Sequence, residues 1–310
     1  MSLIKTNIDY SGKDINLMIS EAFAQTLFYK NFGARRIESV KSKYFYFDIS
    51  NTMSLGAMEC CPTTFGDMTL NQRSGAICDF SMEGKICHTD LIGTARESFY
   101  GKGVEGDNIL NDTVFISAIT ENLLNTAAKN WDNLIINGNT GATTGTYLDL
   151  CDGLLAKWTA DTDVVDVIGV SGGVTAGNVI DELNRVINGV APELLYNPDK
   201  TLKIAVALNI ARAYQQATAS IQSQFTPISQ AQSLMYMGYE LVPLAYLPAS
   251  QMFMTYPENI IMVYDAESDL NRLKIVDLSL TSLCDVVEMQ IKFRGANDYG
   301  FGKDIVWYHA

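Results

Sequence analysis

The feature that most constrains this chain is an uninterrupted run of helix-compatible residues from Asn111 to Asn137. Asn111 or Asp112 can cap the first free amides, and Gly138 supplies a stop signal after the last turn. Such a helix is roughly 35–40 Å long, which matches the width of a small domain. We therefore expect a spine helix along which the rest of the chain is laid. Its apolar row recurs every four residues: Phe115, Ile119, Leu123, Ala127 and Trp131.

The acidic composition limits the partners of the chain. Among 310 residues, 47% are hydrophobic, which is enough for a real core, and the formal net charge is −13. A surface that holds nucleic-acid phosphates needs clustered cations, whereas the densest basic group here is Arg35 and Arg36 with Lys41 and Lys43. This composition argues against sequence-specific nucleic-acid binding. No apolar run reaches about 18 residues, so we expect no transmembrane helix and no membrane partner.

A strand pattern with apolar or aromatic side chains on both faces precedes the spine helix. In the segment KSKYFYFDIS, the aromatic residues run from Tyr44 to Phe47, and the chain returns as Met68–Gln72 and Ala76–Met82. We interpret this as a long projecting hairpin. Because an isolated hairpin is marginal in water and the sequence offers no obvious internal cover, we expect a neighbouring subunit to cover it. The predicted subunit-contact residues are Tyr44, Phe45, Tyr46, Phe47, Phe65 and Met68.

The remaining segments have mixed α and β patterns. Residues 160–250 alternate candidate strands with candidate helices, which predicts a small mixed or parallel sheet with helices packed on it. Residues 251–310 return to strand patterns. Residues 1 to about 34 read as an arm with a short helix that ends near Gly33, and such an arm needs a partner surface.

One catalytic motif is present and is weakly supported. Gly169–Gly173 fits G-x-S-x-G, the nucleophile elbow of serine hydrolases, with Ser171 as the nucleophile. The motif needs a histidine that reaches the serine, and only His309, the penultimate residue, follows it in the usual order. We favour a tight glycine-rich turn and keep the hydrolase as a remote alternative.

We expect no metal and no cofactor. Cys60, Cys61, Cys78, Cys87 and His88 lack the C-x₂₋₄-C spacing that turns two thiolates onto one zinc ion. The N-terminal residues lack the continuous apolar core of an export signal, so unpaired, reduced thiols are the expectation. The sequence also lacks a Walker loop and a dinucleotide fingerprint. The carboxylates of residues 161, 163 and 166 are interpreted as a solvated face.

The order of these elements resembles the Hong Kong 97-like capsid fold of tailed-bacteriophage major capsid proteins, which encapsulin shells share. Local strings add to the resemblance. Lys85–Leu91 looks like the end of an extended hairpin loop, and Met289–Gly295 resembles a late strand of the peripheral domain. Trp131–Thr140, followed by Leu150–Leu154, looks like the end of the spine helix and its loop. The resemblance spans nearly the whole chain.

The resemblance implies an α+β fold with an axial domain inserted into a peripheral domain. The implied boundaries are an N-terminal arm at 1–35, an extended hairpin loop at 36–92, a peripheral domain with the spine helix at 93–160, the axial domain at 161–250, and a peripheral return at 251–310.

The resemblance also implies a structural role and not an enzyme. The chain would be a shell subunit that self-assembles into the hexamers and pentamers of an icosahedral phage head. That head would enclose double-stranded DNA without sequence-specific binding. The implied location is the virion capsid, assembled in the bacterial host cytoplasm, with separate scaffolding and portal proteins. Some members of the family crosslink a lysine to an asparagine between subunits, and because those positions have no match in this sequence, we expect no crosslink. The alternative is an encapsulin-like nanocompartment.

Overall fold

The structure is a computed structural model that describes residues 8–11, 26–37, 40, 43–51, 67–87, 113–222, 234–264, 272–278 and 286–310. Its helices are α2 (Leu27–Phe32), α5 (Thr113–Asn137), α6 (Leu154–Ala160), α7 (Val179–Gly189), α8 (Pro192–Leu195) and α9 (Leu208–Gln222), with 3-10 turns η2 (Tyr147–Leu150), η3 (Pro257–Asn259) and η4 (Gly302–Asp304). The strands before α5 are β1 (Ile8–Ser11), β2 (Arg35–Ile37), β3 (Lys43–Asn51), β4 (Met68–Ala76) and β5 (Cys78–Cys87). The later strands are β6 (Val165–Ile168), β7 (Lys203–Ala207), β8 (Leu234–Tyr236), β9 (Tyr239–Leu244), β10 (Met252–Thr255), β11 (Ile260–Tyr264), β12 (Arg272–Asp277), β13 (Val286–Tyr299) and β14 (Val306–His309).

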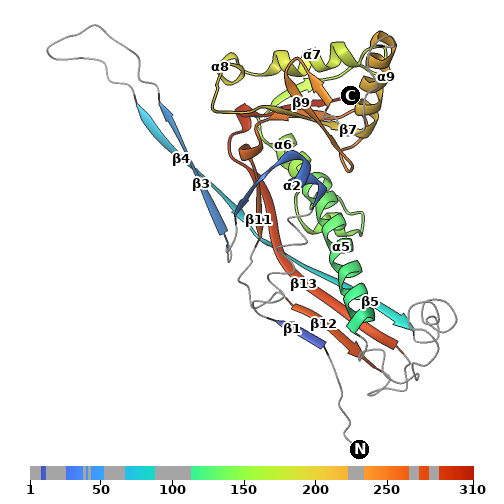
Figure 1. Ribbon diagram of the computed structural model, residues 1–310. Helices are drawn as coiled ribbons and strands as arrows, with labels where there is room; N and C mark the ends of the chain where they lie inside the picture. The colour runs from blue at the N-terminus through green and yellow to red at the C-terminus, as the bar shows by residue number, and fades with distance from the viewer. Residues whose placement is uncertain are drawn as a thin grey trace, which may run out of the picture.

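The predicted spine helix is confirmed as α5, a single helix of 25 residues that runs beside β13 and β5 (Figure 1). It ends where predicted, and the Gly138 N–H donates to the carbonyl oxygen of Leu134 at 2.9 Å. Trp131 is buried and meets the ring of Phe80 edge-on, with centroids 5.2 Å apart. A Cβ at Gly295 would lie 2.6 Å from the Trp131 ring, so the absence of a side chain there lets the helix approach β13 closely.

The first sheet has the order β1-β12-β13-β11-β2, and β5 also pairs with β13. Strand β13 is its longest strand at 14 residues, and it pairs antiparallel with β5 from Val286↔Cys87 to Gly295↔Cys78. The buried and exposed positions of β13 alternate through its first nine residues, because only one face is covered by α5. The two segments that carried the resemblance therefore lie on paired strands: residues 85–87 are opposite residues 286–288, and residues 289–295 are opposite residues 78–84.

The second sheet has the order β6-β14-β10-β7-β9-β8 and mixes parallel and antiparallel pairs. Helices α7 and α9 contact each other and the strands of this sheet (Figure 1). The predicted mixed sheet with packed helices is thus confirmed. The structure differs in one respect: β10 and β14, which the sequence assigned to the return segment 251–310, pair with strands of 161–250. Their pairing is set by long-range register, which local patterns do not reveal.

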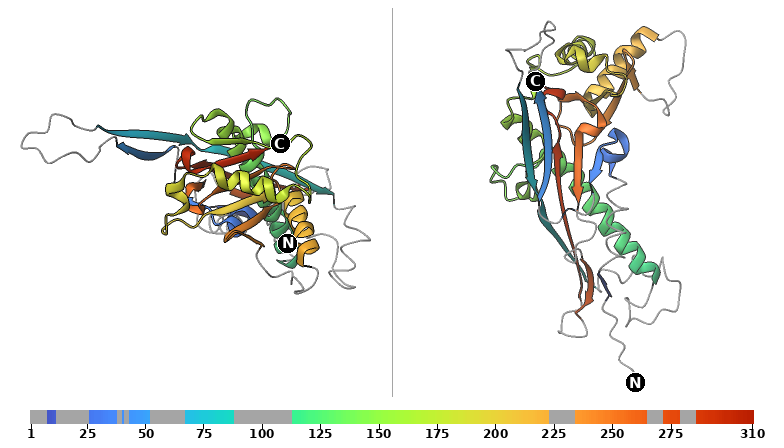
Figure 2. Two further views of the ribbon diagram at one scale, coloured as in Figure 1. Left: turned by 90° about the horizontal axis from the view of Figure 1, so that it is seen from above. Right: turned by 90° about the vertical axis from the view of Figure 1, so that its left-hand side faces the viewer.

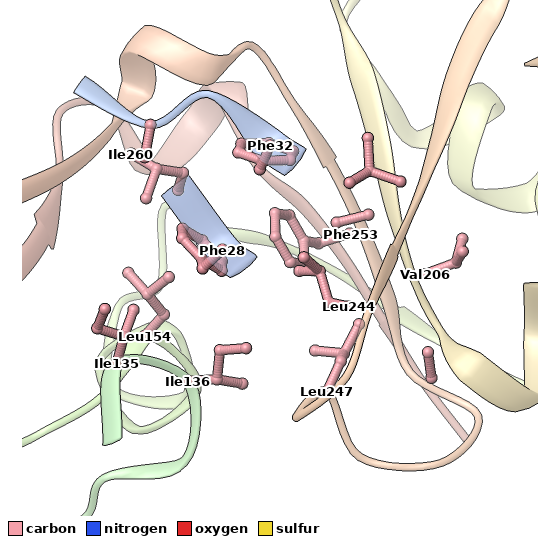
Figure 3. Close-up of a cluster of buried hydrophobic side chains, with 14 of the residues drawn as sticks. Phe28, Phe32, Ile135, Ile136, Leu154, Val206, Leu244, Leu247, Phe253 and Ile260 are labelled. Atoms are coloured by element: carbon pink, nitrogen blue, oxygen red, sulfur yellow. The ribbon is translucent and has the colours of Figure 1, made fainter. Parts of the chain in front are cut away.

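Helix α2 is a wedge between the spine helix and the second sheet (Figure 3). Its Phe28 and Phe32 are fully buried, and the Phe32 ring lies 5.4 Å from that of Phe253 on β10. The Phe28 N–H donates to the buried carboxylate of Asp132 on α5 at 3.3 Å, so the spine helix supplies an oxygen to the free amides of α2. Gly33 ends the helix in the left-handed region with φ +87°, as predicted. Residues 12–25, the earlier part of the expected helix, lie outside the described residues.

The expectation of unpaired thiols is wrong for one pair of cysteines. Cys78, at the start of β5, and Cys151, after η2, form a disulfide with Cα atoms 6.1 Å apart. This spacing lies within the range that a disulfide spans. The pair is separated by 73 residues in the sequence, and only the return of the chain after α5 brings the two together.

Within the described ranges, no helix has the length and apolarity needed to cross a membrane.

Candidate functional site: the projecting hairpin

The hairpin of β3 and β4 extends away from the rest of the molecule (Figures 1 and 2). The two strands pair antiparallel over nine residues, from Lys43↔Ala76 to Asn51↔Met68. They form a separate two-stranded sheet. Residues directly opposite each other in such a ladder place their side chains on the same face. The register therefore fixes which side chains share a surface.

One face of this hairpin is apolar and open to solvent. Phe45 and Phe47 are 52% and 60% exposed, and Met68 and Leu70 are 61% and 63% exposed. Phe45 and Phe47 are two residues apart on β3, and the register places Met68 and Leu70 on the same face of β4. We call these four side chains the apolar strip. A group of exposed apolar side chains on one face of a projection is typical of a protein-contact site.

The opposite face of the hairpin is anchored at its root. Tyr44 is buried and packs with Ile261, Val263 and Ala296 of the first sheet. Its hydroxyl donates to the Asp298 carboxylate at 3.0 Å. The Tyr44 side chain therefore contacts its own chain and holds the hairpin to the body, and a contact of Tyr44 with another subunit stays a prediction.

The structure describes only some of the remaining predicted contact residues. The structure brings Phe45, Phe47 and Met68 together on one exposed face, and their contact with another subunit stays a prediction. Tyr46 pairs with Arg73 in the ladder, but its side chain is not among those described, and Phe65 lies outside the described residues. Sequence reasoning missed Leu70, which the register of β3 against β4 would have identified.

The glycines of the G-x-S-x-G motif have a structural role. A Cβ at Gly169 would lie 2.3 Å from the Tyr308 hydroxyl oxygen. Gly172 and Gly173 have φ values of +102° and +83°, which glycine adopts without strain. The sequence therefore needs glycine at these three positions for close approach and for a turn.

The chemistry around the motif does not assemble a catalytic triad in the described residues. Ser171 is exposed in the turn, and no hydrogen bond joins it to His309 in this part of the chain. The His309 Nε2 lies 3.0 Å from the Asp166 carboxylate. The Tyr308 hydroxyl donates to the buried carboxylate of Glu182 at 2.8 Å. Burial first, and then this hydrogen bond, raise the pKa of Tyr308 to about 12.

Of the candidate metal ligands, only Cys78 and Cys87 lie in the described part of the chain, at opposite ends of β5. Within the described ranges, no group of three or more His, Cys, Asp or Glu side chains has the geometry to hold a metal ion. The Cys78 sulfur is bonded to Cys151 and is therefore not a free thiolate ligand, and Cys87 is a free cysteine at the far end of β5. Cys60, Cys61 and His88 lie outside the described residues.

Comparison with known proteins gives the fold of this chain. No protein-family model matches the sequence, and no curated protein matches it. Among solved structures, a chain of the satellite phage P4 procapsid is 15% identical with a TM-score of 0.60, over 94% of this chain and 98% of that one. A chain from the capsid of Cyanophage P-SCSP1u is 12% identical with a TM-score of 0.54, over 100% of this chain and 90% of that one.

A third similar structure is an encapsulin. A chain of the holo-SrpI encapsulin complex from Synechococcus elongatus PCC 7942 is 9% identical with a TM-score of 0.51, over 89% of this chain and 84% of that one. The resemblance to the capsid family that the sequence suggested is therefore confirmed at the level of the fold: this chain has the fold of phage capsid and encapsulin chains.

Proposed function

We propose that this chain is the repeating subunit of a closed protein shell, and specifically the major capsid protein of a tailed bacteriophage. The observation that carries the proposal is the apolar strip of Phe45, Phe47, Met68 and Leu70, exposed on a projection of a capsid-type fold. A projection with a buried root and an exposed apolar face is suited to lie on a second copy of the same chain. Repeated by rotation, such head-to-tail contacts close into rings, and we propose hexamers and pentamers.

The strip supplies a useful share of the contact energy. Complete burial of a large apolar side chain is worth about 1.5–3 kcal/mol. Because each of the four is between 52% and 63% exposed, covering the remaining surface would contribute about 1–1.5 kcal/mol per residue. The strip as a whole then contributes about 4–6 kcal/mol per subunit. Many such modest contacts add up to a stable shell.

The finer assignments of the resemblance belong to this proposal. We assign the first sheet and α5 to the peripheral domain, and residues 161–250, with β10 and β14 added, to the axial domain. The net charge of −13 suits a wall that encloses double-stranded DNA without adhering to it. The proposed setting is a virion assembled in the host cytoplasm with separate scaffolding and portal proteins.

Electron microscopy of the purified chain tests the proposal. Wild type should form closed icosahedral particles, and a variant lacking residues 52–66 should remain a folded subunit that does not close shells. The fold of the variant is verified by circular dichroism and by its melting temperature before particles are counted. Normal shells from this variant, or a monomeric wild type at high concentration, would contradict the proposal.

The alternative is an encapsulin-like compartment, which the similarity to the encapsulin chain supports. The two functions differ in what the particle encloses. Nuclease-protected DNA inside particles purified from the native source would identify a phage head. Particles that contain a co-purifying protein and no DNA would instead identify a cargo compartment.

A further inference from the structure

The disulfide lies at the joint where the hairpin leaves the body. Cys78 is the first residue of β5, and β4 ends two residues earlier at Ala76. Cys151 lies in the segment of residues 138–153 between α5 and α6, which we call the spine-end loop. The bond therefore connects the root of the hairpin to the end of the spine helix.

The spine-end loop is closed tightly enough to hold Cys151 in a defined place. The Gly153 N–H donates to the carbonyl oxygen of Gly138 at 2.7 Å, and a Cβ at Gly138 would lie 2.2 Å from the Cys151 carbonyl oxygen. The Asp152 carboxylate accepts hydrogen bonds from both the N–H and the hydroxyl of Thr140, each at 2.8 Å. Cys151 is thus presented to Cys78 from a rigid support.

Both cysteines border a cavity that small molecules can enter. The cavity has a volume of about 590 Å³ and lies between the hairpin root and the spine-end loop. Cys151 is buried at 5% exposure, whereas Cys78 is partly exposed. The residues along its two sides include Ser74, Gly75 and Ala76 from the hairpin and Thr140 and Asp152 from the loop. A cavity of this volume is large enough for part of a tripeptide-sized thiol, and both cysteines are among the residues that line it.

We propose that Cys78 and Cys151 form an exchangeable redox staple, which small-molecule disulfides close and small-molecule thiols open. When closed, the staple fixes the hairpin root against the spine-end loop. When open, the root keeps the Tyr44 contacts with the first sheet and the hydrogen bond to Asp298, but it loses its covalent link to the spine-end loop. Both cysteines belong to one chain, so the staple does not depend on assembly, and its test is separate from that of the shell function.

The chemistry is two successive thiol–disulfide exchanges. The Cys78 thiol loses its proton to solvent, and the thiolate attacks one sulfur of oxidised glutathione. A Cys78–glutathione disulfide forms, and one glutathione thiolate leaves and takes up a proton. The Cys151 thiol then loses its proton, and its thiolate attacks the Cys78 sulfur and forms the protein disulfide. The second glutathione leaves as a thiolate and takes up a proton. Two protein thiols are oxidised, and one small disulfide is reduced to two thiols.

The two cysteines have different roles in this sequence. Cys78 reacts with oxidised glutathione first because it is the more exposed, and Cys151 resolves the mixed disulfide because it is buried beside it. Reducing surroundings such as a cytosol keep such a pair open, and oxidising surroundings close it. A subunit made in a cell would therefore carry an unlinked hairpin root, which becomes linked to the spine-end loop after release.

Purified wild type in buffers of varied reduced-to-oxidised glutathione ratio tests the staple. Free thiols are blocked with N-ethylmaleimide, and the Cys78–Cys151 peptide is quantified by mass spectrometry without reduction. The linked fraction should rise from near zero to near complete as the ratio falls, and opening should lower the melting temperature by about 5–10 °C. The proposal would be overturned if N-ethylmaleimide still blocked both thiols in excess oxidised glutathione, because the disulfide would then not have formed. A disulfide that excess reduced glutathione leaves intact would overturn it as well.

Single substitutions test the order of attack. C151S should accumulate a stable glutathione adduct on Cys78, and C78S should form an adduct on Cys151 at least about tenfold more slowly, because burial limits access. C87S is the matched control, since Cys87 is free in this structure, and it should keep the wild-type response. The double variant C78A/C151A should show no glutathione dependence of its melting temperature. A redox response that survives in this double variant, or equal adduct rates in the two single variants, would contradict the assignment.

Discussion

Replacement of Phe45 and Phe47 by serine separates the stability of the subunit from the stability of its assembly. Both side chains are more than half exposed in the single chain, so the loss of their buried remainder should lower the free energy of unfolding by about 0.5–1.5 kcal/mol each, which denaturant unfolding of the unassembled subunit measures separately. In an assembly that covers them, the same substitutions remove about 1–1.5 kcal/mol each, or about 2–3 kcal/mol per subunit. This corresponds to a rise in the critical concentration for assembly of about 30- to 150-fold.

The measurement is a dilution series followed by light scattering and sedimentation velocity, with denaturant unfolding of the unassembled subunit alongside. Q72S is the matched control, because Gln72 is the exposed cross-strand partner of Phe47 and lies on the same face without adding to the apolar strip. It should assemble at nearly the wild-type concentration. If F45S/F47S assembles at the wild-type concentration, the strip is not a contact surface and the reasoning fails.

Three further predictions concern the body of the molecule. G138A should lower the free energy of unfolding by about 2–3 kcal/mol or more, because the new Cβ meets the Cys151 carbonyl oxygen at 2.2 Å. G84A should cost less than about 1 kcal/mol, because its Cβ would meet only the Met289 side chain at an ordinary contact distance of 4.0 Å. Urea unfolding compares the two variants, and equal losses would contradict the tight crossing at Gly138. F32A should lower the free energy of unfolding by about 3–5 kcal/mol, because it empties a fully buried position. Amide hydrogen exchange should become faster in α2 than in the other elements, and an equal increase in all elements would show that α2 is not a separate wedge. The pKa of Tyr308 is raised in the folded chain, so the folded state holds the hydroxyl proton more tightly than the unfolded state does. The stability from this proton is complete below about pH 10 and is lost as the pH rises toward 12. Y308F should flatten that part of the dependence of the unfolding free energy on pH, and a profile identical to that of wild type would refute the prediction.

The sequence predicted the elements whose signal is local. The spine helix follows from an unbroken apolar period between a cap and Gly138, and the hairpin follows from the aromatic alternation beginning at Tyr44. Features that depend on residues far away in the sequence could not be predicted from local patterns. The side chain of Tyr44 faces its own chain because β11 and β13 happen to supply a cover, and no pattern within β3 distinguishes that face from the exposed one.

Two other features escaped prediction for the same reason. Leu70 joins the candidate contact surface only through the register of β3 against β4. The Cys78–Cys151 bond joins positions 73 residues apart, and cysteine spacing gives no connectivity when the chain also carries four other cysteines. Register and disulfide pairing are both consequences of the tertiary fold, so the information that determines them is spread along the chain.

The antiparallel ladder between β5 and β13 has a mechanical consequence. Its hydrogen bonds run perpendicular to the strands over ten residue pairs, and β13 continues through η4 into β14 of the second sheet. A pull on the hairpin directed along β5 would load these bonds together in shear, instead of opening them one after another like a zipper. Tension applied by a neighbouring molecule would then pass from β5 through β13 to β14 with little extension of the chain.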